Sequence, residues 1–299
     1  MLADMPDAPW LDRVAGITQH RANGVRAPHK PLLILLALGS FQRNGTSVLA
    51  FTDIEERLGD LLIECGRPAN PEYPFFHLRT DGFWTVTMPD GSEPEPKRGS
   101  LREGAVGAFT PAFEEALAAS PTLIAQVADL LLEREFPRTQ HADLLDAVGL
   151  EVAWVEPTLE RARSLRRRDP RFRDQVMFAY QRQCAFCGFD GFMSRSSTGL
   201  EAAHVRWWAF DGPDDVSNGL CLCSMHHKLF DLGVLTVNDG HRIAVSGHFL
   251  GRSPAAERYV HDLDGRPIVE PIAGAAPVAD EHAEWHRAQV FRAPARSVA

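Results

Sequence analysis

The sequence lacks any apolar run long enough to cross a membrane. Its longest apolar stretch, residues 31–38, is far shorter than the roughly 18 residues that a bilayer requires. The N-terminus also lacks a basic segment followed by an apolar one, which is the pattern of a signal peptide. The sequence therefore indicates a soluble protein of the cytoplasm without a membrane partner.

An overall excess of positive charge is also missing. The chain has 31 Lys and Arg against 40 Asp and Glu, and its formal net charge is −9. This balance argues weakly against a protein that binds nucleic acid, because phosphate contacts need cations. However, seven arginines fall within residues 161–173. This run is either a solvated helix face or a phosphate-contacting stripe, and its position just before the cysteine cluster favours the second interpretation.

Cysteine is scarce, and four of the five cysteines lie in the C-terminal half. Without a secretion signal, such clustering favours metal binding over disulfide bonds. Cys184 and Cys187 form a C-x2-C pair, and Cys223 and His226 form a C-x2-H pair. The two pairs supply four ligands for a tetrahedral Zn²⁺, which would hold a small module together. Cys221 remains an alternative to Cys223, although only Cys223 has the tight spacing to the histidine.

The N-terminal residues 1–140 show the pattern of a mainly helical domain. Apolar residues recur at helical spacing in three segments, 30–42, 53–65 and 110–134. Residues 77–79 and 83–87 flank an Asp-Gly pair, which is typical of a β-hairpin. Helices followed by a hairpin are the order of a winged helix, a common DNA-binding architecture. We therefore expect an α+β protein whose N-terminal domain is winged-helix-like.

The remainder of the chain divides by composition into three further segments. Residues 141–175 form an Arg-rich connection, and residues 176–250 hold the cysteine cluster. Residues 251–299 are rich in Pro, Ala and Gly and form a C-terminal extension. No internal repeat is found along the chain.

A second set of polar residues lies between and just after the two ligand pairs. Residues 200–205 (LEAAHV) predict a strand that carries His204, and Asn218 follows 14 residues later. The next predicted helix, 224–232, carries His227 and Asp231 on one face, because they are four residues apart. An imidazole and a carboxylate suit Mg²⁺, Mn²⁺, Co²⁺ or Ni²⁺.

These motifs resemble the HNH endonuclease family, in its zinc-bearing, McrA-like branch. The resemblance covers about 180–240 and rests on five elements in order: C-x2-C at 184, LEAAHV, SNGL, CLCSMHH and KLFD. It implies a zinc-containing ββα-metal fold that hydrolyses DNA with one divalent ion. It also implies that His204 activates water, that Asn218 orients the loop and the base, and that His227 and Asp231 bind the catalytic ion.

The sequence departs from the family pattern at one position. Many HNH sequences carry a second metal ligand just before the general base, whereas this chain has Ala203 there. Glu201 lies two residues earlier on the same strand face and is a candidate replacement. The first ligand of the catalytic ion is therefore open.

A second resemblance covers about 10–140. Residues 21–33 (RANGVRAPHKPLL), 72–78 (EYPFFHL) and 82–84 (GFW) are similar to the sulfur-binding domain of type IV restriction endonucleases, which recognises phosphorothioated DNA backbones. Sulfur is larger, softer and less hydrated than the oxygen it replaces, so an apolar pocket suits it. The candidate pocket residues are Tyr73, Pro74 and Phe75. Candidate phosphate contacts are Arg21, His29, Lys30, Arg79 and Arg102.

Two readings of these N-terminal segments remain. Without the resemblance, residues 73–76 are equally a corner of the core, and residues 28–31 are equally the start of a helix.

With the resemblance, the chain is expected to be a restriction endonuclease that recognises phosphorothioated double-stranded DNA and cuts it. The alternatives are an HNH nuclease directed to another mark such as methylcytosine, or a DNA-binding regulator without catalysis. A homodimer would explain duplex cleavage, since one active centre nicks one strand.

Overall fold

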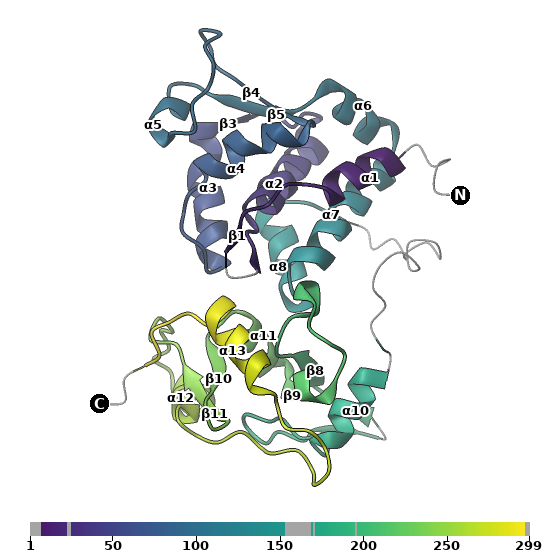
Figure 1. The fold of residues 1–299 in the computed structure, drawn as a ribbon, viewed down its shortest axis with the longest axis vertical. Coiled ribbons are helices and arrows are strands. Elements are labelled where there is room, and N and C mark those ends of the chain that lie inside the picture. The colour runs from purple at the N-terminus through teal and green to yellow at the C-terminus, as the bar shows by residue number, and fades with distance from the viewer. Residues whose placement is uncertain (1–6, 23–24, 153–168, 170, 195, 297–299) are drawn as a thin grey trace. The chain divides into compact units, whose positions relative to one another are not determined.

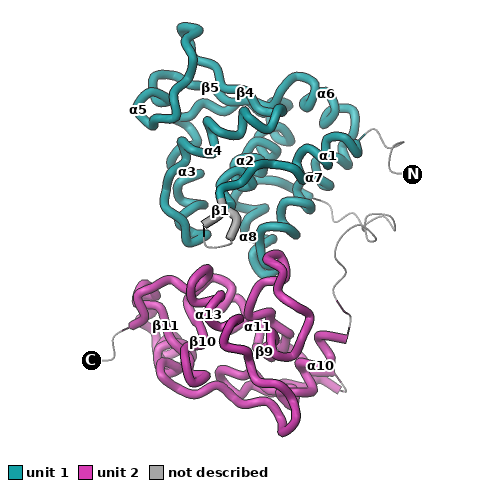
Figure 2. Tube along the Cα trace, viewed as in Figure 1, with its two compact units in different colours: residues 1–156 teal, residues 157–299 magenta. Residues whose placement is uncertain are grey.

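The computed structural model describes residues 7–22, 25–152, 169, 171–194 and 196–296. The chain forms two compact units, 1–156 and 157–299, each with its own hydrophobic core (Figures 1 and 2). Both contain helices and strands, so the predicted α+β class is confirmed. Most of the predicted arginine stripe, residues 161–168, lies outside the described part of the chain.

Unit 1 is mainly helical. Its helices are α1 (Ala8–Ala15), α2 (His29–Asn44), α3 (Phe51–Glu64), α4 (Glu72–His77), η1 (Leu78–Asp81), α5 (Arg98–Leu101), α6 (Pro111–Ala119), α7 (Pro121–Glu135) and α8 (Arg138–Val148). Its strands are β1 (Arg21–Ala22), β2 (Val25–Arg26), β3 (Leu49–Ala50), β4 (Trp84–Thr87) and β5 (Val106–Phe109). β1 pairs with β2, and the other three form an antiparallel sheet in the order β3-β5-β4.

Helix α2 runs through the core of unit 1. Its residues 32–38 are all buried, as expected for an apolar run without an exposed face. Pro31 lies in the first turn, where its missing N–H leaves no bond unmade. Gly45 takes a left-handed conformation (φ 72°) and ends the helix. Since α2 contacts α3, α4, α7 and α8, it is the element around which the unit packs.

The predicted hairpin across Asp81 and Gly82 is wrong. Residues 77–79 are helical, and β4 pairs with β5 instead. The Asp81 carboxylate accepts the backbone N–H of Thr18 (2.9 Å) and pairs with Nζ of Lys30 (2.6 Å). Gly82 (φ 80°) then ends the 3-10 helix η1. The Asp-Gly pair therefore ends a 3-10 helix instead of forming a hairpin turn, and the winged-helix prediction is not confirmed.

The predicted helical stretch 110–134 consists of two helices. Pro121 cannot continue α6, so the chain turns at Ser120, and α7 starts there with a bend of 110°. The apolar residues of α7 are buried in the core of unit 1. In the described ranges, no single helix is long and apolar enough to cross a membrane, and only this bent pair reaches that length and composition.

Unit 2 is built around short antiparallel strand pairs. Its helices are α10 (Arg171–Ala179), η2 (Trp208–Phe210), η3 (Val216–Asn218), α11 (Ser224–Asp231), α12 (Pro254–Tyr259), η4 (His261–Leu263) and α13 (Asp280–Gln289). Its strands are β6 (Phe192–Met193), β7 (Ser196–Ser197), β8 (Leu200–His204), β9 (Gly219–Cys223), β10 (Leu235–Asn238) and β11 (Arg242–Val245). They pair as β6-β7, β8-β9 and β10-β11. The β8-β9 pair followed by α11 has the order of a ββα unit.

Residues beyond 250 pack into the same core. Ile268 and Val278 are buried with the strands of unit 2, and helix α13 contacts β10. The backbone N–H of Val269 donates to the carbonyl of Ala185 (2.8 Å), close to the cysteine cluster. The predicted boundaries at 140, 175 and 250 stay a prediction, but these contacts make the extension part of unit 2.

Acidification is expected to destabilise unit 2 through His286 on α13. The imidazole is fully buried, stacks on Phe230 at 3.7 Å, and its Nδ1 lies 2.9 Å from Oγ1 of Thr236. Burial lowers the pKa of His286 from 6.5 to about 3. The neutral form is therefore the folded one, and its contribution is complete above pH 6.5. It falls as the pH drops from 6.5 towards 3, by at most about 1.4 kcal/mol per pH unit.

The measurement is urea unfolding of the full chain between about pH 8 and about pH 5, compared with the His286→Gln variant. This variant loses the titrating group, so we expect it to be less stable at the higher pH and less sensitive to acid. Equal pH dependence of the two proteins would contradict the assignment.

Candidate functional site

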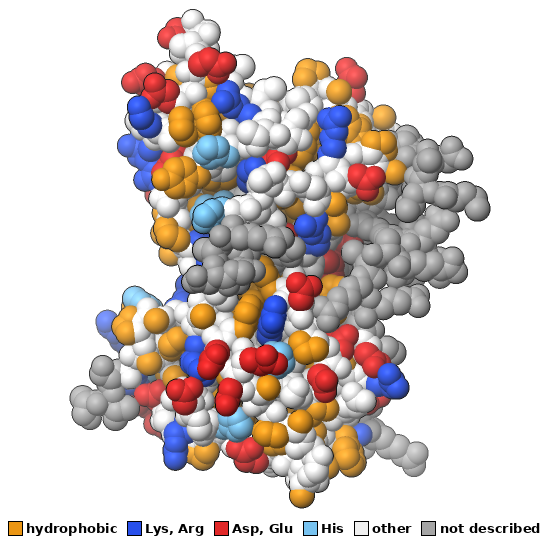
Figure 3. All heavy atoms as spheres, in the orientation of Figure 1, with side chains coloured by type: hydrophobic (Ala, Val, Ile, Leu, Met, Phe, Trp, Pro, Cys, Tyr) orange, Lys and Arg blue, Asp and Glu red, His pale blue; other side chains and the backbone are white. Residues whose placement is uncertain are grey.

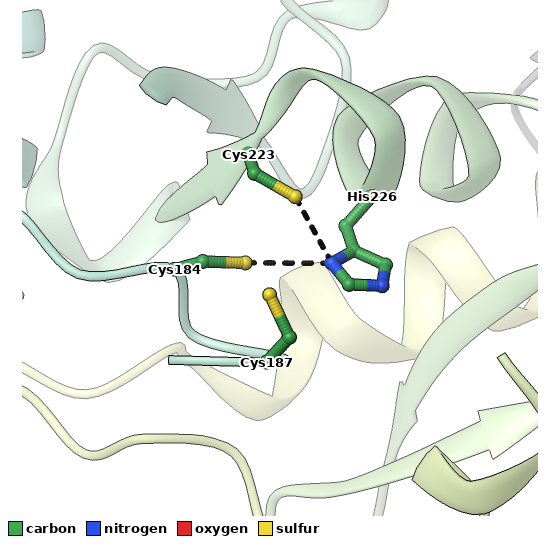
Figure 4. Close-up of side chains that lie close together, drawn as sticks. All are labelled: Cys184, Cys187, Cys223 and His226. Carbon is green, nitrogen blue, oxygen red and sulfur yellow. Dashed lines mark hydrogen bonds between the residues drawn. The ribbon is translucent and has the colours of Figure 1, made fainter. Parts of the chain in front are cut away.

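The four predicted zinc ligands meet at one point of unit 2 (Figure 4). Cys184 and Cys187 come from the turn after α10, Cys223 from the end of β9, and His226 from the first turn of α11. Their ligand atoms all lie within 4.8 Å of one another, and Nδ1 of His226 is 3.1 Å from Sγ of Cys223 and 3.6 Å from Sγ of Cys184. In tetrahedral Zn²⁺ coordination a sulfur and a nitrogen ligand are about 3.5 Å apart. The donor set and the spacing fit zinc.

The electrostatics of the cluster also favour a cation. The pKa of the Cys184 thiol is driven far below its usual range, because Cys187 and Cys223 hydrogen-bond to its thiolate. The same contact drives the pKa of Cys187 upward. Without a cation, only one of these neighbouring cysteines is readily deprotonated, because its thiolate accepts hydrogen bonds from the others. A bound divalent cation would stabilise all of the thiolates.

Cys221 does not join the cluster. It is fully buried in the core, its Sγ lies 3.5 Å from Sδ of Met177, and burial raises its pKa to about 12. The structure therefore favours Cys223 over Cys221 as the ligand. His226 is oriented from its other side, because its Nε2 lies 2.8 Å from the carbonyl oxygen of Tyr259. A metal-binding histidine commonly has such a partner on its second nitrogen.

His204 lies at the end of β8, paired across the ladder with Gly219 of β9. Its ring stacks on Phe172 of α10, with 4.1 Å between centroids. Its Nε2 lies 2.8 Å from Oδ1 of Asp214, whose Oδ2 accepts the backbone N–H of Asp169 (2.7 Å). Since a carboxylate only accepts hydrogen bonds, Asp214 places the imidazole proton on Nε2. The ring is thus held by a stack and by a carboxylate.

Asn218 is fully buried and braces the loop that follows His204. Its Oδ1 accepts the N–H of Arg206 (2.7 Å), and its Nδ2 donates to the carbonyls of Arg206 and Pro213, both at 3.0 Å. The loop closes so tightly that a Cβ at Gly212 would meet the Arg206 carbonyl at 1.8 Å. The predicted orienting asparagine therefore lies directly beside the predicted base.

His227, on α11, lies between two carboxylates. Its Nδ1 is 2.6 Å from Oε2 of Glu201, and its Nε2 is 3.3 Å from Oδ2 of Asp231. Glu201 also accepts a hydrogen bond from Ser224 (2.6 Å), and its pKa is lowered to about 2, mainly by the contact with His227. Asp231 accepts the indole N–H of Trp207 at 3.0 Å. The structure thus brings both candidate carboxylates to the same imidazole.

The roles of Asp214 and Trp207 were not predicted from the sequence. Asp214 lies in the Asp-Gly-Pro-Asp turn, whose composition indicates only a loop, and Trp207 looks like an ordinary core aromatic. Asp214 contacts His204, ten residues away, and Trp207 contacts Asp231, 24 residues away. The spacing of apolar residues along the sequence does not predict such side-chain contacts.

In unit 1 the predicted contact residues have different surroundings. Lys30 is buried and paired with Asp81. His29 is half-buried, and its pKa is lowered to about 4, first by desolvation and then by the charge of Arg67. In the described part of the chain, Nδ1 of His29 and Nε of Arg67 are buried without a hydrogen-bond partner. Arg67 was not among the predicted residues, and these two groups could receive an anion.

The three candidate pocket residues differ in exposure. Tyr73 is 50% exposed, Pro74 is buried, and Phe75 is fully buried. Phe75 packs edge-to-face on Phe51 (5.1 Å) and Trp84 (5.9 Å), so its placement gives it a packing role in the core. Tyr73, at the start of α4, presents its ring to solvent.

The remaining predicted cations lie on the surface or have only their backbone described. Arg79 stacks over the ring of Phe76 at 4.2 Å and pairs with Glu93. Arg102 pairs with Glu55 of α3, which lowers the pKa of that carboxyl. Arg21 belongs to β1, where only the backbone is described. Figure 3 shows basic, histidine and apolar side chains mixed on the face of unit 1 around α4.

Comparison with known families gives one match for each part of the chain. The family described as ScoMcrA-like, DNA sulfur-binding domain matches residues 8–153, and the HNH endonuclease family matches residues 184–238. Both resemblances drawn from the sequence are thereby confirmed. Among curated proteins, no match to the chain is found.

Several solved structures are similar to part of the chain. The sulfur binding domain of SprMcrA complexed with phosphorothioated DNA is 27% identical over 50% of this chain and 97% of that one, with a TM-score of 0.42. The corresponding ScoMcrA domain is 22% identical over 47% and 95%, with a TM-score of 0.41. The modification-dependent TagI restriction endonuclease is 21% identical over 48% and 42%, with a TM-score of 0.31. This chain thus spans less than half of the TagI chain.

Proposed function

Because the chain joins a ScoMcrA-like DNA sulfur-binding domain to an HNH endonuclease domain, we propose that it is a restriction endonuclease for phosphorothioated DNA. Residues 1–140 would recognise the mark, and residues 176–250 would hydrolyse the phosphodiester bond of double-stranded DNA in the cytoplasm. The observation that carries the proposal is the convergence of His204, Asn218 and His227 on one ββα unit within a chain that also carries the reading domain.

His204 acts as the general base in this proposal. Asp214 holds the proton on Nε2, so Nδ1 is the basic nitrogen that takes a proton from the attacking water. As the imidazole becomes positively charged, the Asp214 carboxylate stabilises it, in the way an aspartate supports a catalytic histidine elsewhere. Asn218 fixes the loop that carries Asp214, and Phe172 fixes the plane of the ring.

Two metals have separate roles in the proposal. His227 would help to hold the divalent ion that an HNH endonuclease uses, which stabilises charge on the reacting phosphate; Mg²⁺, Mn²⁺, Co²⁺ and Ni²⁺ are the candidates. Zn²⁺ at Cys184, Cys187, Cys223 and His226 would be structural, because four protein ligands leave no open position. Since one active centre cuts one strand, duplex cleavage would need a homodimer or two successive events.

We propose that recognition combines an apolar contact with the sulfur and contacts between cationic side chains and the neighbouring phosphates. The half-exposed ring of Tyr73 offers an apolar surface that favours a poorly hydrated sulfur, and the buried Pro74 is its neighbour in α4. The charge of Arg67 acts on His29, and in the described residues Nδ1 of His29 and Nε of Arg67 are buried without a hydrogen-bond partner. A neighbouring phosphate would accept a hydrogen bond from the guanidinium of Arg67. Arg21, Lys30, Arg79 and Arg102 stay proposed contacts of the DNA backbone.

Competition binding tests the proposed mark. We expect a phosphorothioated duplex to bind at least about tenfold more tightly than the plain duplex, a difference of about 1.4 kcal/mol. The Tyr73→Ala variant should lose this preference while its affinity for plain DNA stays the same, and Tyr259→Ala, a half-exposed tyrosine of unit 2, is the matched control.

The same titration separates the other functions. Preferential binding of methylated DNA would point to a nuclease directed to that mark. Tight binding of any duplex, with no cleavage in Mg²⁺, Mn²⁺ or Ni²⁺, would indicate a DNA-binding regulator and would overturn the nuclease proposal.

A further inference from the structure

The two carboxylates beside His227 lie on opposite edges of its ring. Glu201 is at Nδ1 (2.6 Å), and Asp231 is at Nε2 (3.3 Å). A neutral imidazole offers one lone pair at a time, so a metal ion can be bound through only one of these nitrogens. The two carboxylates therefore cannot both share an ion with His227, and their surroundings decide which of them does.

The Asp231 side of the ring is closed. The Asp231 side chain is only 2% exposed, and its Oδ1 accepts the indole N–H of Trp207 at 3.0 Å. Trp207 packs in turn against Trp285 of α13, with 5.8 Å between ring centroids. Hard divalent cations such as Mg²⁺ keep several water ligands and also need positions for phosphate oxygens. A carboxylate this enclosed leaves no space for them.

The Glu201 side of the ring is open. The Glu201 side chain is 42% exposed. Ligand atoms about 2.1 Å from an octahedral ion lie about 3.0 Å apart, so the 2.6 Å contact would have to lengthen by about 0.4 Å. A partly exposed glutamate can make this shift by a small side-chain rotation. Ala203, the position at which many HNH sequences carry a ligand, is fully buried and offers no alternative.

We propose that Glu201 and Nδ1 of His227 bind the catalytic divalent ion. Asp231 is instead a positioning residue that accepts the Nε2 proton of His227, and Trp207 holds Asp231 in place. A histidine that binds a metal through one nitrogen usually donates its other N–H to a carboxylate or carbonyl. This assignment replaces the pair His227 and Asp231 expected from the sequence, and it rests on the proposed nuclease function.

The test measures Mn²⁺ binding by the full-length protein, loaded with zinc, without measuring cleavage. Electron paramagnetic resonance of free Mn²⁺ gives the dissociation constant with and without duplex DNA, in the His204→Ala background so that the DNA stays intact. Glu201→Gln should weaken Mn²⁺ binding at least about 100-fold, whereas Asp231→Asn, whose amide oxygen can still accept the Nε2 proton, should weaken it about tenfold. Asp190→Asn, an exposed carboxylate of the same unit, is the matched control.

Each outcome decides between the two carboxylates. The assignment is overturned if Asp231→Asn weakens Mn²⁺ binding more than Glu201→Gln does, or if Glu201→Gln leaves it unchanged. Recovery of binding in Glu201→Asp would support a direct ligand over a merely structural glutamate. A protein that binds no Mn²⁺ in either condition overturns this assignment together with the proposed divalent-ion site. Mn²⁺ binding that depends on Asp231 and not on Glu201 overturns this assignment alone and leaves the proposed divalent-ion site in place.

Discussion

Replacement of His204 by alanine is expected to lower the cleavage rate by about 10²–10⁴-fold, the usual contribution of a positioned general base. DNA binding should be unchanged, because His204 lies in unit 2 and the predicted reading residues lie in unit 1. The measurement is the single-turnover cleavage of a phosphorothioated duplex at saturating enzyme. His248→Ala, an exposed histidine of the same unit, is the matched control.

The contact with Asp214 makes this prediction sharper. In Asp214→Asn the imidazole keeps its place but loses the negative charge that stabilises its protonated form. We therefore expect a smaller loss of rate than in His204→Ala, and the acid limb of the pH–rate profile should move to lower pH. Wild-type cleavage by His204→Ala would contradict the assignment of the base. An unshifted profile in Asp214→Asn would show that Asp214 has only a structural role.

The zinc cluster shows what could be predicted from sequence alone. Two of its ligands are separated by a two-residue spacer, and so are the other two, so local geometry already directs each pair at one point. The strand 200–204 and the helix 224–231 were predicted nearly to the residue, because their apolar periodicity is strong and both elements are short. Local patterns of this kind need no knowledge of the rest of the chain.

Long-range contacts explain what could not be predicted. The Asp-Gly pair at 81–82 has the local preference of a hairpin turn. In the structure, however, Asp81 is the last residue of a 3-10 helix, where it contacts Lys30, 51 residues away. The role of Asp231 depends on Trp207, 24 residues away, and the freedom of Glu201 depends on its exposure. A sequence shows that Asp231 shares a helix face with His227, but not that an indole encloses it.

Removal of the structural metal is the second change with a large expected effect. Apparent zinc binding in small zinc-stabilised domains contributes about 10–16 kcal/mol, which is comparable to or larger than the total stability of a domain, about 5–15 kcal/mol. Unit 2 has a hydrophobic core of its own, so it depends on zinc less completely than such domains do. The cluster nevertheless ties the turn after α10 to β9 and α11. Helix α11 carries His227, and β9 pairs with β8, which carries Glu201 and His204.

We therefore expect Cys184→Ser, or treatment with a chelator, to release one zinc ion per chain and to abolish cleavage. Unit 2 should become sensitive to protease, whereas unit 1, which packs around α2 without any of the four ligands, should still bind phosphorothioated DNA. Atomic absorption, limited proteolysis and DNA binding measure these three results. Cys65→Ser in unit 1 and Cys221→Ser in the core of unit 2 should retain zinc, since neither thiol lies in the cluster. Retention of zinc by Cys184→Ser, or a protease-resistant unit 2 after chelation, would mean that packing rather than metal binding holds the ββα unit together.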